Sequence, residues 1–141
     1  MPTTALDIAR RSADAMWAED RATQHLGMRI DDIAPGKAVL SMTVNDTMVN
    51  GHGFCHGGYI FTLADSAFAF ACNSYGQRNV AQQCQITYVA PGKLGMRLTA
   101  TAVERHKAER SGIYDITVRD ETGCVIAEFR GHSRSIPGTL V

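Results

Sequence analysis

The first third of the chain changes from a helical to an alternating hydrophobic pattern. Over residues 6–19 apolar side chains recur at roughly helical spacing, at Leu6, Ile8, Ala9, Ala13, Met16 and Trp17. This spacing predicts an amphipathic helix that packs on a larger body. Residues 22–33 show no clear period and are interpreted as a connector with a turn at Gly27. Residues 37–44 then alternate apolar and polar side chains, which predicts a strand.

The middle of the chain is far more apolar. Residues 59–72 are hydrophobic nearly all round and too long for one typical strand, so they predict a buried helix. Four strands are predicted after this helix, at residues 80–90, 95–105, 112–118 and 124–133. The short connections between them favour antiparallel hairpins. The pattern therefore predicts an α+β fold in which a five-stranded antiparallel sheet covers one long helix.

The composition is that of one globular domain over residues 1–141. Hydrophobic residues make up 45% of the chain and charged residues 20%, which disfavours disorder. Fourteen Lys and Arg residues balance fourteen Asp and Glu residues. A nucleic-acid-binding protein would need an excess of positive charge, so nucleic acid is not expected as a partner. The balance also leaves little repulsion against self-association.

Neither a membrane segment nor a secretion signal is predicted. The longest apolar stretch, 59–72, contains Asp65 and is shorter than the roughly 20 residues that a membrane span needs. The first residues mix acids and bases and lack the apolar region of a signal peptide. The four cysteines form no Cys-x-x-Cys pair, so we expect reduced thiols in a cytoplasmic protein.

A glycine-rich loop leads directly into the long helix. Residues 50–58 read Asn-Gly-His-Gly-Phe-Cys-His-Gly-Gly, with four glycines. The last two, Gly57 and Gly58, stand where the helix begins, and a helix N-terminus carries free N–H donors and a partial positive charge. Glycines at this point let a ligand oxygen approach the backbone closely. The loop therefore predicts an oxyanion hole.

Asp65 is the residue whose position packing explains least. It interrupts the apolar helix, where an ionised carboxylate is costly unless it is paired, hydrogen-bonded or hydrated. A solvent-facing or capping acid is the alternative interpretation. Gly57 and Asp65 lie eight positions apart, about 12 Å along a helix, so one chain cannot bring both to the same carbonyl. Two antiparallel helices across a two-fold axis would bring Asp65 of one chain to Gly57 of the other.

The residues of the loop and the helix resemble a known family. Asn50-Gly-His, then His56-Gly57-Gly58, then Leu63-Ala64-Asp65-Ser66 and Ala69-Phe-Ala-Cys-Asn-Ser74 resemble the hotdog-fold acyl-CoA thioesterases. Within that family, the similarity is to the PaaI-type group of phenylacetate degradation. It extends from the first helix to Arg130-Gly131 and so covers nearly the whole chain.

This resemblance implies both a fold and a reaction. The fold is a hotdog, in which a curved antiparallel sheet wraps a long helix, with a further helix at the N-terminus. The family forms dimers with a continuous sheet, usually paired into a homotetramer. Its substrates are aryl-acetyl or hydroxyphenylacetyl thioesters of coenzyme A, which it hydrolyses. No metal or other cofactor is expected.

The resemblance also assigns roles to individual residues. Asp65 is the general base or the nucleophile, and the Gly57 N–H is the oxyanion donor. The other catalytic positions are Asn50, His56 and Ser66, the last a Thr in close relatives. The residues expected to contact the substrate are Gly58, Phe54 and Tyr59.

The sequence is also compatible with several alternatives. His52, Cys55 and His56 lie close together in sequence and would suit a metal site or a Cys–His nucleophile pair. A hotdog hydratase or dehydratase acting on acyl-CoA is the main alternative enzyme. A non-catalytic acyl-CoA-binding module is the other, although it would not need Asp65.

Coenzyme A phosphates need cations, and no residue is singled out for them. The candidates are Lys93, Arg110, Arg130 and Arg134, each of which would equally suit a solvated surface. Phe54, Tyr59, Phe61 and Phe68 would suit the wall of an acyl pocket, but aromatic residues at helical spacing belong to the core more often than to a pocket.

Overall fold

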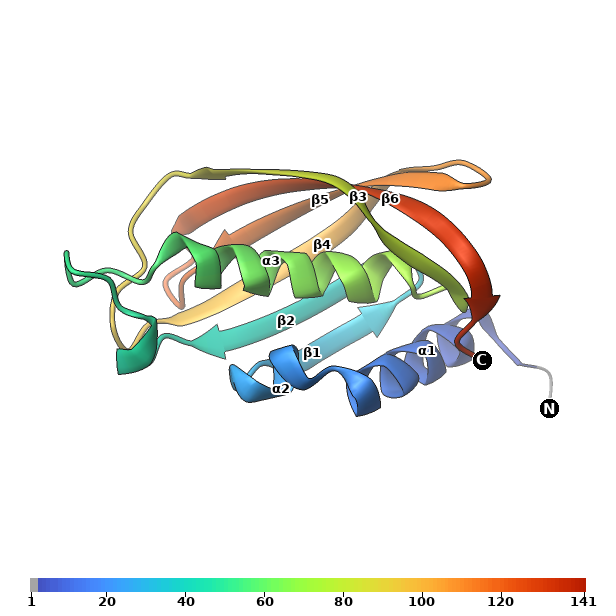
Figure 1. The fold of residues 1–141 in the computed structure, drawn as a ribbon, viewed down its shortest axis with the longest axis horizontal. Coiled ribbons are helices and arrows are strands. Elements are labelled where there is room, and N and C mark those ends of the chain that lie inside the picture. Colours follow the sequence, from blue (N-terminus) through green and yellow to red (C-terminus); the bar gives the residue numbers. More distant parts are fainter. Residues whose placement is uncertain (1–2) are drawn as a thin grey trace.

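The computed structural model describes residues 3–141 and shows one long helix lying across a curved sheet (Figure 1). The chain begins with helices α1 (Ala5–Glu19) and α2 (Arg21–His25) and continues with strands β1 (Arg29–Ala34) and β2 (Lys37–Thr43). A short 3-10 turn, η1 (Asp46–Met48), precedes the central helix α3 (Gly57–Cys72). The second half consists of β3 (Gln77–Tyr88), β4 (Arg97–Lys107), β5 (Ser111–Arg119) and β6 (Val125–Thr139).

The sheet has six antiparallel strands in the order β1-β2-β4-β5-β6-β3. The predicted α+β layout is confirmed, but the predicted number of five strands is wrong because β1 lies in the segment that lacks a clear hydrophobic period. A register shift between Ile30 and Asp32 places the two inward isoleucines three positions apart instead of two. This bulge removes the alternation by which a strand is recognised. The connector also contains the short helix α2.

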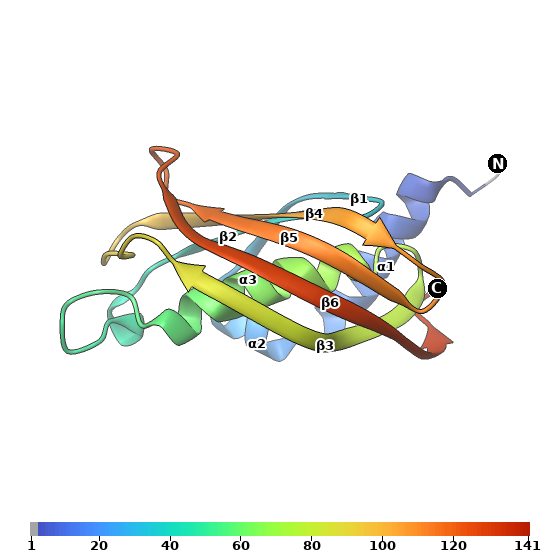
Figure 2. The same cartoon turned by 90° about the horizontal axis from the view of Figure 1, so that it is seen from above.

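Helix α3 lies against the concave side of the sheet and forms the core with it (Figures 1 and 2). Leu63, Ala64 and Ala67 are fully buried, and the small side chains of the two alanines let the helix approach the strands closely. Phe68 packs against Gly131 of β6, where a Cβ atom would lie 2.7 Å from the aromatic ring. The apolar run in the sequence is therefore the centre of the core.

One stripe of α3 is not covered. Gly58, Thr62, Asp65, Ser66 and Ala69 are exposed or half-buried; apart from the half-buried Phe61, the other residues from 60 to 72 are buried. Their spacing of three and four residues places them on one side of the helix. Helix α2 lies beside α3 on one flank and β3, an edge strand, on the other. The stripe is the face of α3 that remains available for another molecule.

The N-terminal helices close the side of the fold next to β1. Thr4 and Asp7 form a capping box at the start of α1, with Thr4 Oγ1 accepting from the Asp7 N–H at 3.1 Å. Ala9 and Ala13 of α1 are buried, which confirms the predicted amphipathic helix. No helix within residues 3–141 is both long and apolar enough to cross a membrane.

Candidate active site

The loop before α3 is held in place by backbone hydrogen bonds to segments distant in sequence. The N–H of Cys55 donates to Gly92 O at 2.7 Å, and the N–H of His56 donates to Met48 O at 2.7 Å. The side chain of Asn50 closes the loop, because its Oδ1 accepts from the N–H groups of His52 and Phe54. Both of these partners are backbone donors, so the side-chain atom that faces them is the oxygen. The Asn50 amide N–H groups are thus directed away from this contact.

His56 caps α3 and separates the roles of the two glycines that follow. Its Nδ1 accepts from the Gly58 N–H at 2.9 Å, so that donor is already used. The Gly57 N–H has no hydrogen-bond partner among residues 3–141. A first-turn N–H that points away from the helix with no acceptor is available to a ligand oxygen. Of the two glycines, Gly57 is therefore the one that can serve as an oxyanion donor.

A hollow of about 420 Å³ lies beside Gly57. Its lining includes Asn50, Phe54, Ile60, Tyr88 and Pro91, so most of its wall is apolar. Neither Gly58 nor Tyr59 lines it. The ring of Tyr59 instead packs edge-to-face against the ring of His56, with the ring centroids 6.2 Å apart. Of the three predicted substrate-contacting residues, only Phe54 lies in this hollow.

Tyr88 was not singled out by the sequence analysis. The end of β3 brings it over the start of α3, where its hydroxyl donates to Gly57 O at 2.9 Å. A Cβ atom on residue 57 would lie only 3.0 Å from the Tyr88 ring, so glycine permits this approach. The two residues are 31 positions apart, and no local sequence pattern connects them.

Asp65 lies two turns further along α3 on the uncovered stripe. Its Oδ1 is 4.0 Å from the Cys84 thiol of β3. Burial raises the pKa of Asp65, and the negative charge of Asp20 raises it further. A carboxyl group with a raised pKa and partial access to solvent is a suitable general base. Since α3 is continuous from Gly57 to Cys72, Asp65 is about 12 Å along the helix from the Gly57 N–H of its own chain.

Ser66 faces the opposite flank of the stripe, toward α2. Its Oγ lies 2.9 Å from Thr23 Oγ1, and the Thr23 hydroxyl donates to Asp20 Oδ2 at 2.6 Å. Thr23 and Asp20 thus connect the N-terminal helices to the residue next to Asp65. Thr23 and Ser66 are 43 positions apart, and no local sequence pattern indicates this contact.

The thiol and metal alternatives find little support in the geometry. Cys55 is buried, and burial raises the pKa of its thiol, which disfavours the nucleophilic thiolate. Within residues 3–141 no group of three His, Cys, Asp or Glu side chains lies close enough together to hold a metal ion.

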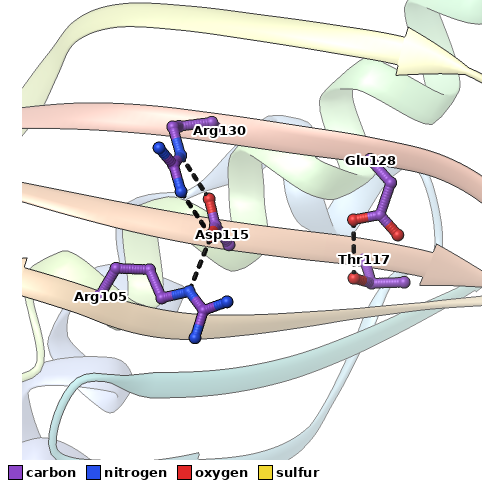
Figure 3. Close-up of polar contacts among 5 residues, drawn as sticks. All are labelled: Arg105, Asp115, Thr117, Glu128 and Arg130. Carbon is purple, nitrogen blue, oxygen red and sulfur yellow. Dashed lines mark hydrogen bonds and ion pairs between the residues drawn. The ribbon is translucent and has the colours of Figure 1, made fainter.

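The four candidate cations fall in different places. Arg130 is engaged on the outer face of the sheet, in a two-point ion pair with Asp115 (Figure 3). Arg110 and Arg134 line a shallow hollow with Gln77, at the start of β3. Lys93 lies near the glycine loop, where it forms an isolated bridge with Phe54.

Comparison with known proteins decides the family. A family model described as the thioesterase superfamily matches residues 52–127. The acyl-coenzyme A thioesterase PaaI of Escherichia coli is 46% identical over 132 residues, which cover 94% of both chains. The chain belongs to the thioesterase superfamily.

Solved structures with a similar fold agree with this membership. The Escherichia coli PaaI protein from the phenylacetic acid degradation operon superposes with a TM-score of 0.95 and 44% identity, covering 96% of this chain and 99% of that one. A Streptococcus mutans protein solved with acetyl-CoA bound gives a TM-score of 0.77 at 28% identity, covering 79% and 90%. The predicted hotdog fold and the predicted membership among PaaI-type acyl-CoA thioesterases are confirmed.

Proposed function

We propose that this thioesterase hydrolyses aryl-acetyl thioesters of coenzyme A, such as phenylacetyl-CoA or hydroxyphenylacetyl-CoA, to the free acid and CoA. The similarity to a protein of the phenylacetic acid degradation operon supports this substrate class. The hollow beside Gly57 supports it as well, because its apolar wall of Phe54, Ile60 and Pro91 suits an aromatic or aliphatic group.

The observation that carries the proposal is the pairing of an unoccupied donor with a half-buried acid on one helix. The Gly57 N–H has no partner among the described residues, and Asp65 has a raised pKa. Thioester hydrolysis needs a donor to stabilise the developing oxyanion and a base to activate the nucleophile. Both must lie within a few ångströms of one carbonyl, whereas in one chain they are about 12 Å apart.

We infer that a two-fold dimer removes this separation. The midpoint between Gly57 and Asp65 is residue 61, and Phe61 is half-buried on α3. If two copies of α3 cross antiparallel near Phe61, Gly57 of each chain faces Asp65 of the other. The edge strand β3 leaves one side of its backbone free to pair with its copy, which would make the sheet continuous. Two such dimers would form the expected homotetramer.

In this site the roles divide between two subunits. One subunit supplies the Gly57 N–H to the thioester oxygen, with His56 holding the helix start and Asn50 presenting its amide N–H groups. The other supplies Asp65 and Ser66. Asp65 either activates a water molecule or attacks the carbonyl carbon itself to form a mixed anhydride. In the first route the C–S bond breaks and the water proton taken up by Asp65 passes to the CoA sulfur. In the second the C–S bond breaks, CoA leaves as a thiolate that takes a proton from solvent, and water then hydrolyses the anhydride to release the acid and regenerate Asp65.

The test is a complementation experiment with two inactive variants. Asp65→Asn removes the base, and Gly57→Pro removes the oxyanion donor. Proline is tolerated at the first position of a helix, and the extended backbone of His56, with ψ of 132°, is the conformation that a residue before proline prefers. Gly57→Ala is the matched control, because it adds the same Cβ atom near Tyr88 but keeps the N–H.

We expect each variant alone to hydrolyse phenylacetyl-CoA at least about 100-fold more slowly than the wild type. After the two are unfolded together and refolded, half of the dimers are mixed, and each mixed dimer has one intact site of two. Activity should therefore recover to about a quarter of the wild-type value. No recovery, with mixed dimers shown by mass spectrometry, would place both groups of a site in one chain and contradict the proposal. A panel of aryl-acetyl, benzoyl and aliphatic CoA thioesters then tests the substrate class.

A further inference from the structure

The contact between Ser66 and the N-terminal helices has a defined hydrogen-bond direction. Asp20 accepts twice from Thr23, through Oδ1 from the N–H at 3.0 Å and through Oδ2 from the hydroxyl at 2.6 Å. An ionised carboxylate accepts and does not donate, so the single hydroxyl proton of Thr23 is directed at Asp20. The hydrogen bond of 2.9 Å between Thr23 and Ser66 must then be donated by Ser66.

This direction changes what Ser66 can do on the uncovered stripe. Its own proton points to Thr23, which is only 1% exposed and therefore holds a fixed position. The remaining lone pairs of Ser66 Oγ can only accept. Asp65, its neighbour in the chain, is likewise an acceptor when ionised.

Two adjacent acceptors favour one orientation of a water molecule between them. A water molecule held by both would donate one proton to Asp65 and the other to Ser66, so that a lone pair would face away from the helix toward the substrate. If Ser66 were free to rotate, it would donate to the water or to Asp65 and weaken the nucleophile or the base.

We propose that Thr23 and Asp20 are positioning residues for hydrolysis, because they fix the Ser66 hydroxyl as an acceptor and so orient the attacking water beside Asp65. The proposal rests on the proposed function, with Asp65 as the general base. The water oxygen bonds to the carbonyl carbon while one water proton passes to Asp65. The C–S bond then breaks, and that proton passes to the departing CoA sulfur. The second proton remains with the product acid.

Asp20 also acts on Asp65 through its charge. It raises the pKa of Asp65 in addition to the effect of burial. The other titratable groups near Asp65 are Cys84 on β3 and Cys72 on α3, and the pKa values of both thiols are raised, to about 11 and about 12. These thiols are neutral at the pH of the assay, which leaves Asp20 as the negative charge that tunes the base.

The test uses Thr23→Val, which keeps the shape but removes the hydroxyl, and Thr23→Ser as the matched control. With phenylacetyl-CoA we expect Thr23→Val to lower kcat about tenfold with little change in KM, the scale of one hydrogen bond. Thr23→Ser should retain the wild-type kcat. In a Ser66→Ala background Thr23→Val should cause no further loss, because the effect passes through Ser66.

Asp20→Asn tests the direction of the hydrogen bonds independently. Asparagine still caps α2, but its amide would donate to Thr23 and turn the Thr23 proton toward Ser66. We expect a loss of kcat similar to that of Thr23→Val. The acid limb of the pH profile should also move to lower pH, because the charge that raises the pKa of Asp65 is gone. Thr23→Val keeps this charge and should leave the limb in place.

A kcat of Thr23→Val within about twofold of the wild type would overturn the proposal. It would also be overturned if Thr23→Val lowered kcat as much in the Ser66→Ala background as in the wild type, or if Thr23→Ser lost activity like Thr23→Val. If Thr23→Val does not fold, the pH profile and kcat of Asp20→Asn decide. Asp65→Asn distinguishes a failure of the proposed function from a failure of the positioning role. If it stays active, the proposed function fails; if it is inactive while Thr23→Val and Asp20→Asn are both unimpaired, only the positioning role fails.

Discussion

Asp115 on the outer face of the sheet is the charge whose removal should change stability most clearly. It lies on β5 between Arg130 of β6 and Arg105 of β4 (Figure 3). Arg130 donates to both carboxylate oxygens at 2.6 and 2.8 Å, and Arg105 Nε donates to Oδ2 at 2.8 Å. The hydrogen bonds from Arg130 are the largest cause of the lowered pKa of Asp115, which falls to about 2, and the hydrogen bond from Arg105 lowers it further. One two-point pair and one single hydrogen bond thus connect three neighbouring strands through Asp115.

The magnitude of the stabilisation follows from this shift. A change from 3.8 to about 2 corresponds to about 2.5 kcal/mol at about 1.4 kcal/mol per pKa unit. Solvent screens part of it, because 26% of the Asp115 side chain is exposed, so we expect about 1–2 kcal/mol. The folded-state pKa is lower than the unfolded value. The stabilisation is therefore complete above about pH 5 and is lost as the pH falls toward 2.

The assay is urea unfolding of the wild type and Asp115→Asn at one protein concentration, from pH 7 to pH 3. The variant should unfold more easily at pH 7 by about 1–2 kcal/mol, and the difference should shrink to about half by pH 3. Asp32→Asn is the control, since Asp32 forms a single exposed pair with Lys37 at 3.7 Å and should have little effect. A difference that stays constant from pH 7 to pH 3, or that matches the control, would refute the electrostatic argument.

Three further predictions concern packing, the acid and the thiols. Gly131→Ala should lower the free energy of unfolding by about 1–3 kcal/mol in the same urea assay, because its Cβ would lie 2.7 Å from the Phe68 ring. The control is Gly51→Ala, whose Cβ would have no heavy atom within 4 Å and which should leave the free energy of unfolding nearly unchanged. The kcat/KM of hydrolysis should rise with pH through an acid limb lying above 3.8, because burial raises the pKa of Asp65 and only the ionised form is a base; a limb at or below 3.8 would contradict this. Brief alkylation of the folded protein at pH 8, followed by mass spectrometry, should label the exposed Cys124 and spare the other three thiols, whose pKa values are raised by burial.

Much of the fold was predictable because the information is local. The apolar run of α3 extends beyond any single strand, and the alternating segments that follow it can bury only one face each against it. Strand β1 was missed for an equally local reason. Its bulge shifts the isoleucine spacing, and its acidic residues give it the composition of a surface loop.

The candidate site was predictable only in part. Asp65 and Gly57 stand out because an acid inside an apolar helix and glycines at its start are both unfavourable without a compensating role. Tyr88 and Thr23 do not stand out. Neither belongs to a local sequence pattern, and only the folded structure brings the Tyr88 hydroxyl to Gly57 and the Thr23 hydroxyl to Ser66.

The sequence by itself determined the first helix, the central helix, five of the six strands and the two groups whose chemistry requires explanation, because hydrophobic period and residue type act over a few positions. Only the tertiary structure decided that the Tyr88 hydroxyl lies over Gly57, that Thr23 holds Ser66, and which face of α3 is uncovered. Those properties depend on contacts between residues 31 and 43 positions apart. Such contacts form only when the sheet folds around the helix, and no short-range pattern encodes them.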